Sequence, residues 1–321
     1  MVPAAWCVES TRAAAVADAA EPSASPAVAD PVTLSWWPVA WWTLGAIVAI
    51  VLARRVEWMR QMPREGPAWR VRPEASVFGF GAAFLATAIG AMVGAWWVGQ
   101  PAGAVAGAAA GGLAGTAARS IGAHLGQLAV VVGTTFAPGA RIPGGARAVG
   151  HGGIHAQPRG QLESLALALA FAIGLWAVVQ SVGGWVQLVQ QWWGGSTPAV
   201  GHRTLEAMAG SGAGDPWWWA TVLSAALLAP IAEEWTFRGL LQQGLKGVGL
   251  GRLGAVLVTS ALFAIVHWSA LADGARAVGV ASLFALSVGW GLLYERTGRM
   301  AAPVLAHALF NTANLIIATR G

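Results

Sequence analysis

The stretch APIAEEWTFRGLL, residues 229–241, places two carboxylates and a guanidinium in the middle of an apolar segment of membrane length. Charged groups at membrane depth are costly, which makes them candidates for a functional site. Pro230 removes a backbone donor just before the carboxylates and predicts a kink there. Glu234 and Arg238 are four residues apart, so they share a helix face and can form an ion pair. Glu233 lies about 100° around the helix from Glu234 and is free to point at another group.

The composition around this stretch predicts a polytopic membrane protein. Hydrophobic residues make up 56% of the 321 residues and charged residues only 10%, whereas about 25% of an average soluble domain is charged. The expected fold class is an all-α helix bundle with about eight transmembrane helices of roughly 20 residues each. The candidate spans are 35–53, 76–98, one within 101–137, 162–182, 217–244, 254–272, 277–294 and 300–318.

Three parts are expected along the chain. Residues 1–34 are rich in Ala, Pro, Ser and Asp without an apolar period, which predicts a disordered N-terminal tail. Residues 35–160 hold N-terminal transmembrane helices and basic loops, and residues 161–321 hold the part that carries the charged groups. The one cysteine, Cys7, excludes an intrachain disulfide framework and a Cys-based metal cage.

The basic residues predict the orientation in the membrane. Most of the 19 lie in four loops, and eight spans put these loops on one side, the cytoplasm by the positive-inside rule. The net charge of +5 therefore fits a bilayer, and no nucleic-acid partner is expected. The basic residues counted in these loops and in the region after Glu234 are Arg54, Arg55, Arg60, Arg64, Arg70, Arg72, Arg141, Arg147, Arg159, Arg238, Lys246, Arg252, Arg296 and Arg299. Tryptophans at the opposite helix ends predict an outer aromatic belt. They are Trp36, Trp37, Trp41, Trp42, Trp96, Trp97, Trp185, Trp192, Trp193, Trp217, Trp218, Trp219 and Trp268.

The third span has two interpretations. Segment 101–118 is mostly Ala and Gly, and segment 121–137 is more apolar. Two crossings would move loop 138–160 outside, so one crossing fits the charge rule better. Small residues repeat every four positions in this region, which predicts close packing against another helix, with a channel lining as the alternative. They are Gly103, Gly107, Gly111 and Gly115.

Two later spans carry imidazoles at helical spacing. Phe263 and His267 are four apart in FAIVH, and His307 and Asn311 repeat this spacing in HALFN, so each pair shares a face. Two carboxylates, two imidazoles and a carboxamide can activate a water and hold an oxyanion. The residues thus predict an intramembrane hydrolase, in first place a protease. The other histidines lack a charged partner at helical spacing and are interpreted as packing or loop residues. They are His124, His151, His155 and His202.

The three motifs resemble those of the CAAX prenyl endopeptidase and bacteriocin-processing (CPBP, or Abi) family of membrane proteases. EEWTFR at 233–238, FAIVH at 263–267 and HALFN at 307–311 match the family's EExxxR, FxxxH and HxxxN patterns in order. The resemblance covers residues 217–318 and implies that 161–321 is a protease core of this type. It implies a multi-pass endopeptidase of the cell membrane, often classed as a metalloendopeptidase. Its substrates would be membrane-associated or lipidated peptides, as in CAAX processing.

The resemblance also implies roles for the residues. Glu233 and His267 would activate the attacking water, and the ion pair of the first motif would shape and charge-balance the site. His307 and Asn311 would stabilise the tetrahedral oxyanion. Glu233, His267 and His307 are the ligands if a zinc site exists, but the HExxH spacing is missing. A glutamate mechanism that requires no cofactor is therefore preferred.

A transporter or channel is the alternative function, because such proteins also place Glu, His and Asn inside the membrane. Against it, the two halves show no inverted repeat and the polar groups cluster in the last third. At 1.5 Å per residue, Glu233 lies ~24 Å past Trp217 and His307 roughly 10 Å past Met300, which predicts a site open to the cytoplasm. His267 lies ~20 Å from that side, so convergence needs a tilted or deeply starting helix.

Overall fold

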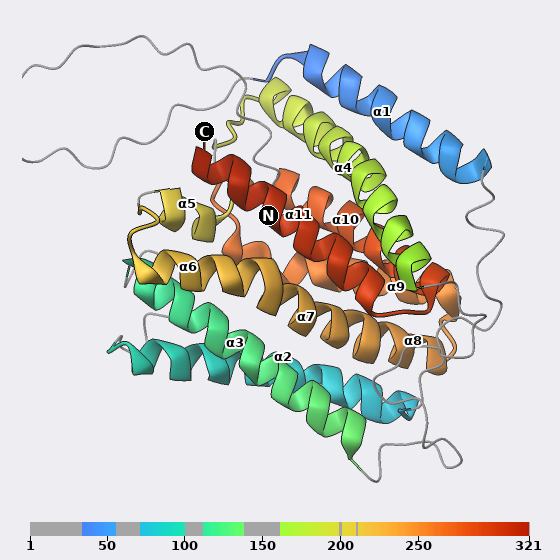
Figure 1. Cartoon of the computed structure of the whole chain (residues 1–321). Coiled ribbons are helices and arrows are strands. Elements are labelled where there is room, and N and C mark those ends of the chain that lie inside the picture. Colours follow the sequence, from blue (N-terminus) through green and yellow to red (C-terminus); the bar gives the residue numbers. More distant parts are fainter. Residues whose placement is uncertain are drawn as a thin grey trace, which may run out of the picture.

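The computed structural model describes residues 34–55, 71–99, 112–137, 161–198, 201–209 and 211–320. These residues form a bundle of helices (Figure 1), and His202 and Leu271 form an isolated antiparallel bridge. Six helices in the described part are long and apolar enough to cross a membrane. The predicted class, an all-α polytopic membrane bundle, is confirmed. The six spans are Trp36–Arg54, Pro73–Trp97, Ala166–Trp192, Gly251–Ala270, Arg276–Thr297 and Ala301–Thr319.

The other two predicted spans are also helical. The third is α3 (Gly112–Phe136). The span 217–244 lies in a continuous helical stretch, 216–247, that alternates between α and π hydrogen bonding, so none of its segments alone has membrane length. Its segments are α6 (Pro216–Leu223), η4 (Ser224–Leu228), α7 (Ala229–Glu234), η5 (Trp235–Gln242) and α8 (Gln243–Gly247).

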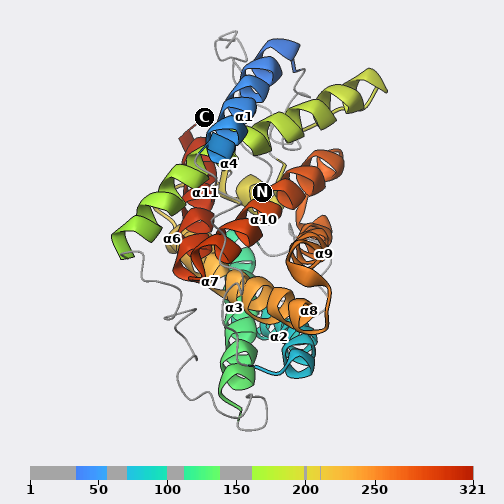
Figure 2. The ribbon, with the colours of Figure 1, turned by 90° about the vertical axis from the view of Figure 1, so that its right-hand side faces the viewer.

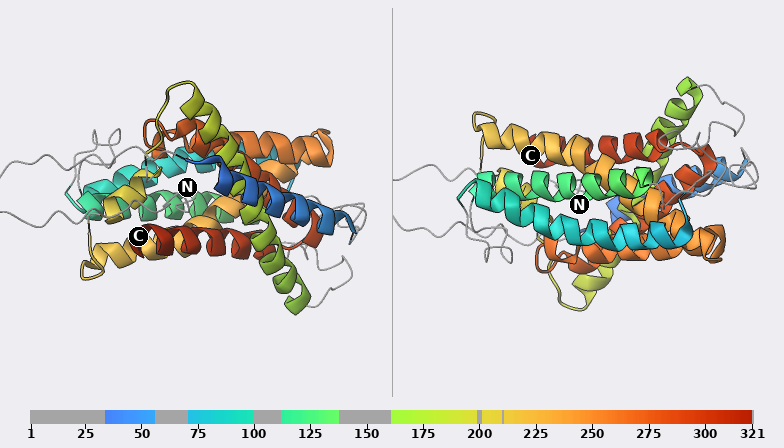
Figure 3. Two further views of the ribbon diagram at one scale, coloured as in Figure 1. Left: turned by 90° about the horizontal axis from the view of Figure 1, so that it is seen from above. Right: turned by 90° about the horizontal axis from the view of Figure 1, so that it is seen from below.

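The remaining helices surround this stretch. Figures 1 and 2 show α2 and α3 on one side of it, α9, α10 and α11 on the other, then α4, with α1 at the far edge. The views from above and below agree, with α1 and α4 in front in one and α2 and α3 in the other (Figure 3). The bounds are α1 (Trp36–Arg55), α2 (Pro73–Trp97), α4 (Gln161–Trp192), α5 (Arg203–Ala209), α9 (Gly251–Val266), η6 (Trp268–Ala270), α10 (Arg276–Thr297) and α11 (Ala301–Arg320).

The direction of the helices agrees with the predicted sidedness of the basic loops. The end of α1, the start of α2, the end of α3 and the start of α4 lie at the right-hand end of the bundle in Figure 1. The α8–α9 and α10–α11 connections lie at the same end. One helix, α3, is described within 101–137. Residues 1–33, 56–70, 100–111 and 138–160 lie outside the described part, and they include nearly all of the predicted tail and most of the first two basic loops.

Glycines allow α2 and α3 to approach backbone to backbone. A Cβ atom added at Gly90 would clash with the carbonyl oxygen of Gly122, and one at Gly126 with that of Ala86. A Cβ atom added at Gly94 would likewise clash with the carbonyl oxygen of Ala118. Close packing of the third span therefore exists, with glycines four apart on both helices. Of the predicted repeat, Gly115 is buried in α3, and Gly103, Gly107 and Gly111 lie outside the described residues.

The apolar core lies between α4, α9, α10, α11 and the 216–247 stretch. Phe237, Phe263 and Trp290 are each no more than 2% exposed there. The outer surfaces are also apolar, and tryptophans stand out at the helix ends away from the basic loops, where Trp97 and Trp192 are 79% and 82% exposed. Such a surface suits lipid and an interfacial aromatic belt.

Candidate active site

The two carboxylates sit on α7, a short α-helical segment between two π-helical ones. The Ala229 N–H donates to Ser224 O, a π-type bond, and Pro230 has no N–H to offer. Neither of them can therefore serve the carbonyl oxygen of Ala225. Asn311 Nδ2 of α11 donates to this oxygen at 2.8 Å. The chain keeps helical backbone angles on both sides of Pro230, so the predicted kink takes the form of a change in hydrogen-bond register.

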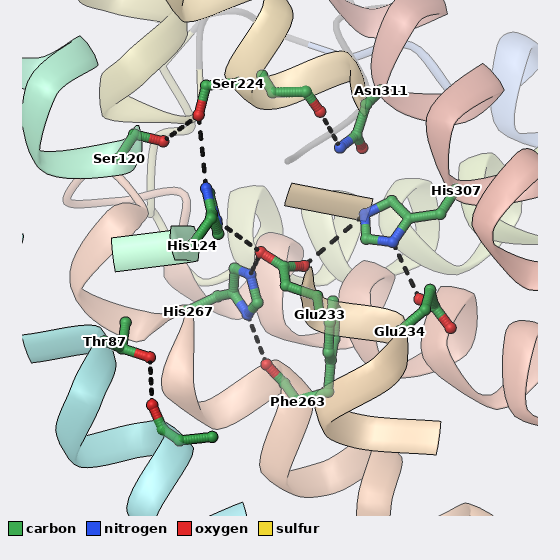
Figure 4. A network of polar contacts seen from close by, with 12 residues as sticks. Thr87, Ser120, His124, Ser224, Glu233, Glu234, Phe263, His267, His307 and Asn311 are labelled. Atoms are coloured by element: carbon green, nitrogen blue, oxygen red, sulfur yellow. Dashed lines mark hydrogen bonds and ion pairs between the residues drawn. The ribbon is translucent and has the colours of Figure 1, made fainter. Parts of the chain in front are cut away.

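Glu233 lies among three imidazoles (Figure 4). Its Oε1 is 3.6 Å from His124 Nε2 and 3.8 Å from His267 Nε2. Its Oε2 is 3.8 Å from His307 Nε2. The side chain is 13% exposed, so it is shielded without being sealed. The structure thus brings the three motif helices together at one carboxylate. It does so although the residue counts along the helices place His267 and His307 at different depths in the membrane.

His267 is held in one orientation at the end of α9. Its Nδ1 is 2.6 Å from the carbonyl oxygen of Phe263, which can only accept, so Nδ1 carries the hydrogen. In the neutral ring, Nε2 is then an acceptor and faces Glu233. The Phe263 ring lies against the imidazole with a centroid distance of 4.5 Å. The predicted pairing of Phe263 and His267 on one face is confirmed.

Glu234 divides its carboxylate between two partners. Oε1 is 3.0 Å from His307 Nδ1, and Oε2 is 3.2 Å from Arg238 Nε, which confirms the predicted ion pair. Glu234 and Arg238 are both fully buried. Arg238 also donates from Nη2 to Oγ and the carbonyl oxygen of Ser287, at 2.8 and 3.0 Å. The Trp290 ring stacks on His307 with centroids 3.8 Å apart.

His124 was interpreted as a packing residue, and the structure corrects this. Its charged partner, Glu233, lies on another helix, and helical spacing along one segment cannot reveal such a partner. The one available signal was an imidazole inside an apolar span. His202 is a buried loop residue, as interpreted, and its Nδ1 accepts from the Thr204 N–H at 3.2 Å. Burial lowers the pKa of His202 well below its usual value, so this ring is neutral. His151 and His155 lie outside the described residues.

The arrangement offers no ready metal cage. In the part of the chain that the structure describes, no group of three or more His, Cys, Asp or Glu side chains is arranged to hold a metal ion. Glu233, His267 and His307 meet at one place, but as a carboxylate faced by ring nitrogens at 3.8 Å. As arranged, these three side chains do not fit a zinc site.

Comparison with known families identifies the same part of the chain. Residues 215–313 match the model of the family described as type II CAAX prenyl endopeptidase Rce1-like. The matched residues include all three motifs, so the resemblance seen in the sequence is confirmed there, and the match supports assignment to the CAAX protease (CPBP) family. No curated protein and no solved structure matches the chain. His124 lies outside the matched residues.

Proposed function

We propose, on the premise of this family assignment, that the protein is an intramembrane endopeptidase that cleaves membrane-associated or lipidated peptides in CAAX-type processing. The observation that carries the proposal is the convergence of His267 and His307 on the carboxylate of Glu233. A shielded carboxylate with imidazoles beside it suits general acid–base catalysis.

Water activation falls to Glu233 and His267. Glu233 Oε1 and His267 Nε2 are both acceptors, 3.8 Å apart, so one water molecule can donate a hydrogen to each. When this water attacks the scissile carbonyl carbon, its proton moves to Glu233. The protonated Glu233 then gives this proton to the leaving amine as the peptide C–N bond breaks.

Oxyanion stabilisation falls to His307 and Asn311. His307 donates from Nδ1 to Glu234, so its Nε2 can donate to an oxyanion only in the doubly protonated ring. The Glu234 carboxylate stabilises that cation and shares its own charge with Arg238. Asn311 keeps a second amide hydrogen beside the one given to Ala225 O. Both side chains are held in place by these partners before the reaction, and donors positioned in advance are what electrostatic stabilisation of the oxyanion requires.

An apolar cavity supports a lipidated substrate. It has a volume of about 1300 Å³ and lies between α1, α4, α10 and α11. Trp290, which stacks on His307, belongs to its lining together with Leu175 and Phe310. A hydrocarbon chain in this cavity would lie next to the ring that supports the oxyanion site. The lipid anchor and the scissile bond of one substrate can thus be held side by side.

Release of a C-terminal tripeptide tests the proposal. The purified protein is reconstituted in liposomes with a peptide that ends in a farnesylated Cys followed by three residues, and the tripeptide is detected by mass spectrometry. Glu233→Gln is the inactive variant, and Asp273→Asn, the same change at a surface carboxylate that is 77% exposed, is the matched control. Equal release by wild type and Glu233→Gln, or none by wild type, would refute the proposal.

We further propose that the site opens toward the cytoplasm of the cell membrane. The proposal is supported by the helix ends that flank the basic loops, which lie at one end of the bundle (Figure 1). Its test is labelling of single cysteines placed beside Glu233 with a membrane-impermeant thiol reagent, after Cys7→Ser. Labelling only from the outer face would reverse the orientation.

A further inference from the structure

Helix α3 contributes an imidazole to the candidate active site from outside the residues matched by the family. His124 Nε2 stands 3.6 Å from Glu233 Oε1, closer than either motif histidine stands to this carboxylate. The His124 and Glu233 side chains are each 13% exposed, so both face the same shielded space. Figure 4 shows the rings of His124 and His267 both directed at the same oxygen of Glu233.

Two hydroxyl groups orient the His124 ring from its other side. His124 Nδ1 is 3.4 Å from Ser224 Oγ, which is 2.9 Å from Ser120 Oγ. Ser224 can donate to Nδ1 while it accepts from Ser120. In this arrangement the hydrogen of the neutral ring lies on Nε2, directed at Glu233. The Glu233 carboxylate can only accept, so it favours the form of His124 with the hydrogen on Nε2, and the hydroxyl pair can satisfy Nδ1 in that form.

We propose that His124 is a positioning residue of the protease, whose Nε2–H holds Glu233 Oε1 next to His267. The inference rests on the proposed function. A carboxylate contacted only on one side can rotate about its last torsion, which would carry Oε1 away from the water that it shares with His267. The 3.6 Å separation shortens when substrate closes the site, as catalytic hydrogen bonds commonly do. His124 thus acts through Glu233 and not on the substrate.

The same atoms also follow the order nucleophile, base and carboxylate of a serine hydrolase, with Ser224 as the nucleophile. Burial argues against that role. Ser224 is only 1% exposed, and its hydroxyl is engaged by Ser120. A substrate carbonyl could not approach this oxygen without opening the contact between α3 and η4. We therefore assign Ser224 to orienting His124.

Two substitutions of the same residue separate positioning from packing. The amide nitrogen of Gln can take the place of His Nε2, whereas that of the shorter Asn reaches only the place of Nδ1. We expect His124→Gln to keep kcat within about threefold of wild type. We expect His124→Asn to lose roughly 10–100-fold in kcat with little change in KM, the effect of a lost hydrogen bond to a charged group. Ser224→Ala should lower kcat less than His124→Asn.

A second measurement tests the contact without activity. Thermal unfolding in detergent is compared for His124→Asn, Glu233→Gln and the double variant. Residues in contact give non-additive shifts in Tm, and independent residues give additive ones. Non-additive shifts support the contact, and additive shifts would overturn it.

The outcomes are distinguishable from failure of the proposed function. A wild-type protein that cleaves nothing refutes that function. With an active wild type, unchanged kcat in His124→Asn, equal losses in the Asn and Gln variants, or an effect confined to KM would each overturn the inference about His124. Complete loss of activity in Ser224→Ala, with covalent labelling of wild type by a fluorophosphonate, would make Ser224 the nucleophile and also overturn it.

Discussion

Two carboxylates inside the bundle are held in opposite ways. Glu295 on α10 is fully buried, and its oxygens receive Gln242 Nε2 at 2.9 Å, Lys246 Nζ at 2.9 Å and Arg252 Nε at 3.2 Å. Glu233 is partly reachable, and its ion-pair partners are imidazoles at 3.6–3.8 Å.

The difference separates a structural carboxylate from one suited to chemistry. Glu295 joins α8, α9 and α10 near the end where the basic loops attach, and its lone pairs are committed to permanent cations and an amide. Glu233 has imidazole neighbours, which can change protonation, and none of them lies closer to it than 3.6 Å. A buried charge with complete partners stabilises a fold only as long as all partners stay, whereas a loosely held carboxylate can exchange a proton.

The largest expected effect is on the reactive carboxylate. Glu233→Gln keeps the shape of the side chain but not its basicity, so we expect kcat to fall by on the order of 10²–10⁴ with an unchanged Tm. Glu233→Ala should be equally inactive. Turnover is measured on the lipidated peptide and Tm by fluorescence in detergent. If Glu233→Gln unfolded the protein while any folded fraction stayed active, Glu233 would have a structural role, like Glu295, and no role in catalysis.

The second largest effect is expected for the two oxyanion donors, His307 and Asn311. We expect His307→Ala and Asn311→Ala each to lower kcat by roughly 10²–10³ with little change in KM, because such donors act in the transition state. Steady-state kinetics over a range of peptide concentrations separate the two constants. A rise in KM at constant kcat would make these residues substrate-binding groups instead.

Glu295 should affect stability and not the chemical step. Glu295→Ala leaves Lys246 and Arg252 without their shared anion, so we expect a loss of about 3–5 kcal/mol in unfolding free energy. Activity per folded molecule should stay near wild type. Asp273→Asn is the control, because this surface carboxylate is 77% exposed and its pairs should be worth less than about 1 kcal/mol. Equal destabilisation by both variants would contradict the comparison.

Removal of metal should have the smallest effect. If Glu233 works as a base held by imidazoles, strong chelation leaves turnover unchanged. If instead Glu233, His267 and His307 bind zinc, elemental analysis should find about one zinc per chain, and chelation should abolish an activity that zinc restores. Bound zinc with an activity that depends on it would make Glu233 a metal ligand and not a free base.

Features that depend on a single segment could be predicted from the sequence. Apolar length located the spans, and four-residue spacing paired Glu234 with Arg238 and Phe263 with His267. Features that depend on which helices are neighbours could not be predicted. The glycine contacts between α2 and α3, the stacking of Trp290 on His307 and the approach of His124 to Glu233 all join distant segments. The identity of a residue does not indicate which residue on another helix it contacts.

Pro230 has a consequence for α11 rather than for its own helix. The missing hydrogen on its nitrogen leaves a vacant acceptor at Ala225, and the amide of Asn311 docks there. The missing amide hydrogen of Pro230 thus allows a hydrogen bond that fixes the rotation of α11 about its own axis. Because His307 lies one turn before Asn311, that setting also aims the imidazole. Proline is usually regarded as a helix breaker. In this bundle, Pro230 instead leaves open the backbone acceptor through which α11 is hydrogen-bonded to the 216–247 stretch.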